Sequence, residues 1–385
     1  MKSYAVPLLA VLAGLPAGAA LAVSSPALEE GFRIASAIQN DAKDRGRAQE
    51  SVVLDLAEAG FPDEAARKAD QVEGWRRGVA YAEIARILAR QDRLEEARAL
   101  LAKADAVRAA TEGWEGSRIE AHAGQARALV GQMDRTESTA LRLVEEDQLQ
   151  YAGLPAIVKA SAQAARGEID PALATLGDGE KVALEMVWWR TSVFLEIARS
   201  PKATPEQRRK ALEAGRTDAA RLEEVITRLD ALERVATAAA EAGMEDLALA
   251  VIESTHPLVA GMPDTAVLKG AYLAGEARTL ARLGRAPAAR ERLASALASS
   301  AGIGILDRPA ILANIAGGYQ ALTDSAETSR VLGLALAEAE ALANARPRAL
   351  AAVEICRAAA RFGIPWSEGT ARRVASLRSG LQAPW

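Results

Sequence analysis

Apolar residues recur along this chain with the 3.6-residue period of an α-helix, in segments separated by breaks at glycine, aspartate or proline. The first segment of each unit carries a recurring triplet, which reads Ile84-Ala85-Arg86, Gln125-Ala126-Arg127, Ile197-Ala198-Arg199, Glu276-Ala277-Arg278 and Ile355-Cys356-Arg357. Degenerate copies follow the same rhythm at 235–237 and 315–317. A triplet that returns at roughly 40 residues, or about twice that across a degenerate copy, predicts a stacked array of helical repeats.

The breaks give the expected turns between the two helices of each repeat. They fall near Gly60, Asp92, Met133, Gly167, Pro201, Gly243, Gly284, Asp324 and Gly363, at spacings of 32 to 42 residues. Acidic residues usually follow the break, as in Glu95-Glu96 and Glu245-Asp246. Negative charge suits the first turn of a helix, where the helix dipole is positive. The pattern therefore predicts eight or nine antiparallel helix pairs.

The apolar positions within one pair resemble those of a tetratricopeptide repeat. In the copy that begins at Gly78, they are Tyr81, Ile84, Ala85 and Leu88 on the first helix, then Ala97, Leu101 and Ala104 on the second. The resemblance covers most of residues 45–370, although several copies are nearer 40 residues than the usual 34, a length that HEAT-type repeats also have. It implies an all-α fold, a right-handed α-solenoid whose first helices line a concave groove.

The ends of the chain and one internal break suggest its organisation. Residues 1–22 have the basic start, apolar stretch and Ala-Leu-Ala ending of a cleavable signal peptide, with no cysteine near the cleavage site. We expect a helical lead-in at 23–44, the repeat array at 45–366, and a capping helix with a tail at 367–385. The proline-bearing segment 200–205 is interpreted as a turn inside one solenoid, with a hinge as the alternative.

The signal peptide predicts a periplasmic or secreted protein with no membrane-spanning segment after cleavage. The chain that remains carries 46 Lys and Arg against 51 Asp and Glu, because only Lys2 is removed. Mild acidity argues against nucleic acid as a partner. A single cysteine, Cys356, excludes an internal disulfide. It replaces the alanine of the triplet, so we expect a small buried apolar residue.

Nothing in the sequence is typical of catalysis, and we expect neither an enzyme, a cofactor nor a metal site. The two histidines, His122 and His256, lie far apart, and no metal-binding, nucleotide-binding or hydrolase motif is present. We interpret His122 as a satisfied core residue and His256 as a contact at a helix end.

The recurring arginines are the candidate binding residues. Arg86, Arg127, Arg199, Arg278 and Arg357 share one register, and Arg90, Arg282 and Arg361 follow four residues later on the same helix face. If this face lines a groove, the guanidinium groups would hold an acidic peptide segment or a terminal carboxylate. The alternative is structural, because Glu83, Glu196 and Glu354 lie three residues before an arginine and would form intrahelical pairs.

The function that these observations favour is a non-catalytic protein–protein interaction scaffold or adaptor in the bacterial envelope, with a partner segment in the groove. The alternative is an accessory subunit of an envelope or anionic-polysaccharide assembly machine. The near copies Glu73-Gly74-Trp75 and Glu112-Gly113-Trp114 are interpreted as packing between repeats, with a peptide-binding patch as the second interpretation.

Overall fold

The computed structural model describes residues 25–132, 134, 154–177, 184–263, 266–382 and 385. The signal peptide expected at 1–22 and its cleavage site lie outside these residues. Within the described ranges the chain is helical and contains no strand, which confirms the all-α fold. None of the helices described is long and apolar enough to cross a bilayer.

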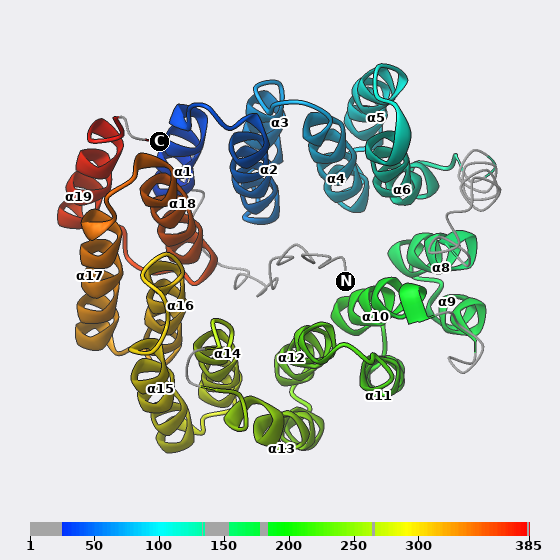
Figure 1. Ribbon diagram of the computed structural model, residues 1–385. Coiled ribbons are helices and arrows are strands. Elements are labelled where there is room, and N and C mark those ends of the chain that lie inside the picture. The colour runs from blue at the N-terminus through cyan, green and yellow to red at the C-terminus, as the bar shows by residue number, and fades with distance from the viewer. Residues whose placement is uncertain (1–24, 133, 135–153, 178–183, 264–265, 383–384) are drawn as a thin grey trace.

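Eighteen helices in the described part of the chain form two rows (Figure 1). The inner row is α2 (Ala42–Glu58), α4 (Arg76–Arg90), α6 (Gly113–Leu129), α8 (Leu154–Arg166), α10 (Leu184–Arg199), α12 (Val225–Glu241), α14 (Lys269–Arg282), α16 (Arg308–Ala321) and α18 (Ala345–Arg361). The outer row is α1 (Pro26–Ala37), α3 (Pro62–Ala69), α5 (Leu94–Ala109), α9 (Ile169–Leu176), α11 (Pro205–Ala220), α13 (Glu245–Ala260), α15 (Ala286–Ser300), α17 (Ser325–Ala341) and α19 (Glu368–Ser379).

Most inner helices end in the same backbone turn. A residue with positive φ follows the helix, at Gly60, Asp92, Gly131, Gly167, Gly243, Gly284, Thr323 and Gly363. The next N–H returns to the carbonyl five residues earlier, as from Arg285 to Leu280 O (2.8 Å) and from Ile364 to Ala359 O (2.9 Å). This is the Schellman arrangement, which satisfies carbonyls left free at a helix end. It also reverses the chain so that the outer helix packs against the inner one.

The predicted breaks agree closely with these turns. Six of them are the positive-φ residue itself, whereas Met133 lies outside the described residues and the turn residue there is Gly131. At the predicted Asp324, the preceding Thr323 has the positive φ, and the Asp324 carboxylate caps α17.

Alanine and leucine fill the space between the rows. The apolar positions expected in the copy that begins at Gly78, which forms α4 and α5, are all buried, and Ile84, Ala85, Ala97 and Ala104 are fully enclosed. Each inner helix contacts the inner helix before and after it, so the pairs stack side by side. Cys356 is also fully buried, which confirms it as a small core residue.

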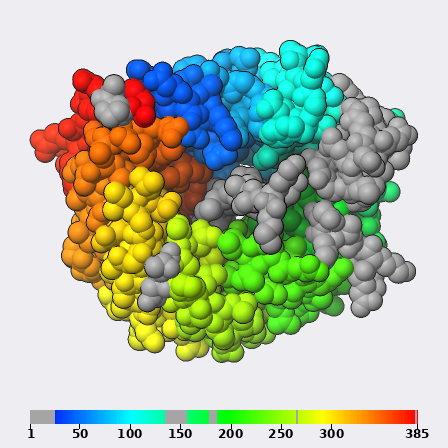
Figure 2. All heavy atoms as spheres, viewed as in Figure 1, coloured from blue at the N-terminus to red at the C-terminus, as the bar shows by residue number. Residues whose placement is uncertain are grey.

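The two ends of this row meet and close it into a ring (Figure 1). Helix α1 packs along α18 as its outer partner and also contacts α2, while α18 contacts α2 directly. Ion pairs cross the junction from Arg346 Nη1 to Asp41 Oδ2 (2.7 Å) and from Arg378 Nε to Glu30 Oε1 (2.6 Å). In Figure 2 the blue N-terminal helices adjoin the orange and red C-terminal ones. The expected lead-in thus contains the helix that completes the last pair.

The structure places the predicted break at 200–205 and the predicted C-terminal capping helix. Residues 200–204 join α10 to α11 within one pair. Helix α11 begins with a capping box, in which the backbone N–H of Thr204 donates to the Gln207 side chain and the backbone N–H of Gln207 donates to the Thr204 hydroxyl. The hinge alternative for 200–205 stays untested. The predicted C-terminal cap is α19, which lies against α1, α17 and α18 and buries Val374 and Leu377.

Candidate functional site

The inner helices carry their charged residues toward the interior of the ring. Arg90, Arg199, Arg282 and Arg361 are the last residues of α4, α10, α14 and α18. Since successive inner helices run in the same direction, these arginines gather at one side of the ring. Cations are favoured there because the helix dipole is negative at its C-terminal end.

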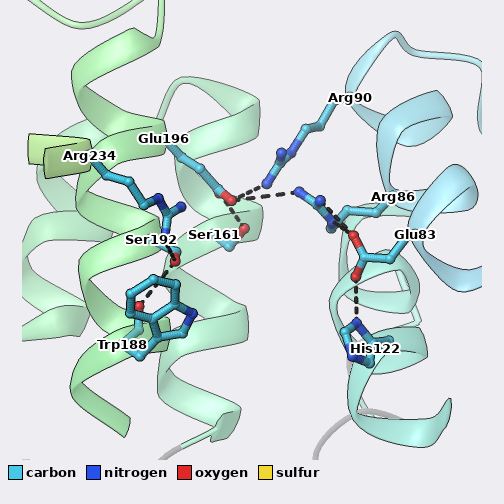
Figure 3. A network of polar contacts seen from close by, with 9 residues as sticks. All are labelled: Glu83, Arg86, Arg90, His122, Ser161, Trp188, Ser192, Glu196 and Arg234. Carbon is cyan, nitrogen blue, oxygen red and sulfur yellow. Dashed lines mark hydrogen bonds and ion pairs between the residues drawn. The ribbon is translucent and has the colours of Figure 1, made fainter. Parts of the chain in front are cut away.

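Glu196 of α10 contacts side chains of α4 and α8 inside the ring (Figure 3). Arg90 of α4 donates to its Oε1, Arg86 Nη1 lies 3.9 Å from the same oxygen, and Ser161 of α8 donates to Oε2 (2.8 Å). Arg86 also donates to Glu83 Oε2 (2.6 Å), and His122 Nδ1 of α6 lies 2.7 Å from Glu83 Oε1. The network therefore links α4, α6, α8 and α10.

Glu241, the last residue of α12, holds the arginines of both neighbouring inner helices. Arg199 Nε donates to Oε2 (2.9 Å), and Arg282 Nη1 donates to Oε1 (3.1 Å). One helical turn earlier on α14, Arg278 pairs with Glu233 Oε1 (3.3 Å) and lies 4.3 Å from the centre of the Phe362 ring.

Asp55 of α2 receives the arginines of α18 across the junction of the ring. Arg357 Nε donates to Oδ2 (2.5 Å), and Arg361 Nη2 donates to Oδ1 (3.3 Å). Arg357 also pairs with Glu354 of its own helix (2.6 Å). These contacts place a buried charged cluster at the point where the two ends of the chain meet.

Arg127 is the candidate that the structure separates from the others. Its guanidinium donates to Asp105 of α5, the outer partner of the preceding pair, and its side chain is 2 % exposed. The other seven candidate arginines pair with carboxylates on the inner row. Two of the expected intrahelical pairs form, Glu83 with Arg86 and Glu354 with Arg357, while Glu196 reaches across to α4.

Burial and neighbouring charge shift several carboxyl groups in the interior. Burial, reinforced by Asp55, raises the pKa of Glu58 to about 8. Burial also raises the pKa of Glu233 to about 7, against the opposing effect of Arg278. For Glu196, burial acts upward, but Arg90 and Arg86 hold the pKa below its usual value. The interior thus contains both ionised, paired carboxylates and carboxyl groups that favour the proton.

Sequence reasoning missed Arg234 of α12, although its position in the repeat is distinctive. It directly precedes the degenerate triplet 235–237, at the register that Glu83, Glu196 and Glu354 occupy in other copies. Glu241 likewise takes the register of Arg90 and its equivalents. Comparing the copies position by position would have shown that α12 has its charges exchanged.

The histidines and the tryptophan pair have ordinary partners. His256 lies within α13 and contacts Glu276 of α14 (2.9 Å), so it is not the helix-end contact expected from the following proline. Among the described residues, no group of three or more His, Cys, Asp or Glu is arranged to hold a metal ion. Trp75 and Trp114 meet edge to face at 5.3 Å, yet Trp114 remains 61 % exposed. Both interpretations of this pair therefore remain open.

The chain matches no protein-family model and has no significant match among curated proteins.

Proposed function

We propose that this protein is a non-catalytic protein–protein interaction scaffold or adaptor of the bacterial envelope, built on right-handed stacking of tetratricopeptide-like pairs. The observation that carries the proposal is the charged interior, where inner helices from all parts of the chain contribute arginines and carboxylates. Charged and polar side chains on successive repeats are suited to recognising an extended segment. The signal-like N-terminus and mild acidity support an exported protein that does not bind nucleic acid.

We expect a partner to bind by replacing ion pairs of the interior, because the arginines there do not form a basic groove without counter-charges. Most of the candidate arginines already have carboxylate partners from neighbouring helices, so an acidic partner would compete with the protein's own groups. Such exchange contributes selectivity, because only a segment with carboxylates at matching positions restores the hydrogen bonds that it displaces.

A pull-down from envelope extract tests the proposal. The bait is the exported chain, residues 23–385, beside a variant with Arg199→Gln and Arg282→Gln. These two side chains are partly exposed and share Glu241, whereas Arg278 packs on Phe362 and its replacement would disturb the fold. We expect the wild type to capture a partner that the variant loses.

The matched control carries Arg209→Gln and Arg285→Gln, which remove two exposed ion pairs between outer helices. It should retain the partner. Equal capture by all three baits would refute the interior as the binding surface. Capture of an anionic polysaccharide instead, weakening with salt, would favour the accessory-subunit alternative.

A further inference from the structure

We propose that Arg234 and Trp188 form a binding site for a carboxylate group inside the ring. The inference rests on the proposed function in one respect, because the carboxylate is assigned to an acidic segment of a partner.

The guanidinium of Arg234 is fixed in position by α10 (Figure 3). It lies 4.8 Å from the centre of the Trp188 ring, and Nη1 donates to Ser192 Oγ (3.2 Å). The Ser192 hydroxyl in turn donates to the Trp188 carbonyl (3.0 Å), which leaves its oxygen free to accept from Arg234. A guanidinium over an indole keeps its N–H groups at its edge, where they are available to a ligand.

No carboxylate of the described residues lies within ion-pair distance of Arg234. Two of the acidic groups that act on Arg234 are engaged elsewhere: Glu196 by Arg90 and Arg86, and Asp230 by the Tyr272 hydroxyl (2.6 Å). Arg234 therefore differs from the seven interior candidate arginines, each of which has a carboxylate partner.

Arg234 lies among other arginines of the inner helices. Five arginines gather there from α4, α10, α12 and α14, namely Arg86, Arg90, Arg199, Arg234 and Arg282. Among the described residues, Glu83, Glu196 and Glu241 pair with Arg86, Arg90, Arg199 and Arg282, and none of the three forms an ion pair with Arg234. Burial and the proximity of Arg199 lower the pKa of Arg234 to about 10, against the opposing effect of Glu196, Asp230 and Glu58, none of which forms an ion pair with it as a direct counter-charge. An anion bound at Arg234 would supply it.

The geometry favours a carboxylate over a spherical or cationic ligand. The edge of a guanidinium presents parallel N–H donors that match the two oxygens of a carboxylate. Its neighbour Glu196 shows the same chemistry, since arginines of α4 already hold a carboxylate that reaches them from α10. A glutamate side chain or a chain terminus of a partner segment could occupy the equivalent place beside Arg234.

The test measures binding of an N-acetylated, amidated hexaglutamate peptide to the exported chain by titration calorimetry at low salt. We expect binding that weakens with salt, and at least a tenfold loss of affinity in Arg234→Gln. Arg234→Lys keeps the charge but lacks the paired donors, so its loss should be intermediate. Arg209→Gln, on the outer surface, is the matched control and should bind like the wild type.

Folding of the variant is checked by its thermal midpoint. Because Arg234 has like-charged neighbours and no carboxylate partner, Arg234→Gln should unfold at the same or a higher temperature than the wild type without peptide. Equal peptide affinity in wild type and Arg234→Gln would overturn the proposal, as would an absence of binding to the wild type. Equal stabilisation by inorganic phosphate at matched ionic strength would overturn the assignment to a carboxylate.

Failure of this site and failure of the scaffold function give different results. If an envelope partner is captured equally by wild type and Arg234→Gln, the function stands and the site does not. If hexaglutamate binds through Arg234 but no partner is captured by any bait, the site stands and the scaffold proposal fails.

Discussion

Three interior carboxylates, Asp55, Glu196 and Glu241, each pair with two arginines, and this sharing makes the charged residues of the ring interdependent. Asp55 binds Arg357 and Arg361, and Glu241 binds Arg199 and Arg282. Removing one such carboxylate would leave two partly buried cations without a partner, which is costly in a low-dielectric environment. The register of the arginines could be predicted from the sequence. Their partners could not, because Asp55 and Arg357 lie 302 residues apart.

Glu58 should make the protein less stable as the pH rises from 5 to 8. Its pKa is raised from 4.5 to about 8, so in this range the folded state keeps a proton that the unfolded state has released. Stability that depends on this proton is fully present below pH 4.5 and is lost as the pH passes 8, at no more than about 1.4 kcal/mol per pH unit. Urea unfolding at several pH values measures it.

Glu58→Gln should flatten this dependence, because the amide stays neutral throughout. Glu95→Gln is the control, since Glu95 is largely exposed and pairs only within its own helix. If the wild type and Glu58→Gln lost equal stability between pH 5 and 8, Glu58 would not hold the proton in the folded state.

At the scale of elements, the positive-φ turn that ends most inner helices is the best-predicted feature of the fold. Glycine at the break is recognisable in sequence because it adopts positive φ without a steric penalty. The non-glycine copies are harder to place: Thr323 has a φ of 54°, yet its neighbour Asp324 is the residue with an evident turn and capping character. A β-branched residue in this conformation is strained.

Thr323→Gly should stabilise the protein by about 0.5–1 kcal/mol. The substitution removes the left-handed strain of about 1–2 kcal/mol, and the greater chain entropy of glycine in the unfolded state offsets part of the gain. The free energy of unfolding from urea titration measures the change.

Gly284→Ala, in the equivalent turn of another pair, should act in the opposite direction by about 1 kcal/mol. Its φ is 73°, and no atom lies within 4 Å of the added Cβ, so the cost comes from the backbone alone. Changes of the same sign in both variants would contradict this account of the turns.

At the scale of the whole molecule, the ring depends on α1 taking the outer place beside α18. Repeat spacing predicted the pairs, because each pair is encoded locally by its apolar period and its turn. The closure of the ring between α1 and α18 could not be predicted from the repeat spacing. It arises from contacts such as that of Gly31 with Cys356, between segments that no periodicity relates.

A cysteine at position 31 should lock the ring. A Cβ built on Gly31 would lie 3.1 Å from Cys356 Cβ, slightly closer than the 3.5–4.5 Å typical of disulfides, so a small separation of α1 and α18 would allow the bond. We expect Gly31→Cys to form a disulfide under oxidising conditions and to raise stability by up to about 5 kcal/mol. Non-reducing electrophoresis and mass spectrometry detect the bond.

Gly31→Ser is the control for the effect of the side chain itself, and reduction should return Gly31→Cys to the stability of that control. Two free thiols in the oxidised variant would show that α1 and α18 are not held together in solution.

The closure through α1 also changes how the array can come apart. Linear helical repeats fray from their terminal units, because those units have a neighbour on one side only. Here the first helix, α1, completes the pair of the last inner helix, α18, and every inner helix described has an inner neighbour on both sides. Apart from fraying of α19, unfolding of the inner row therefore has no free end from which to spread, and its first step must separate α1 from α18 or break the ring at an internal pair.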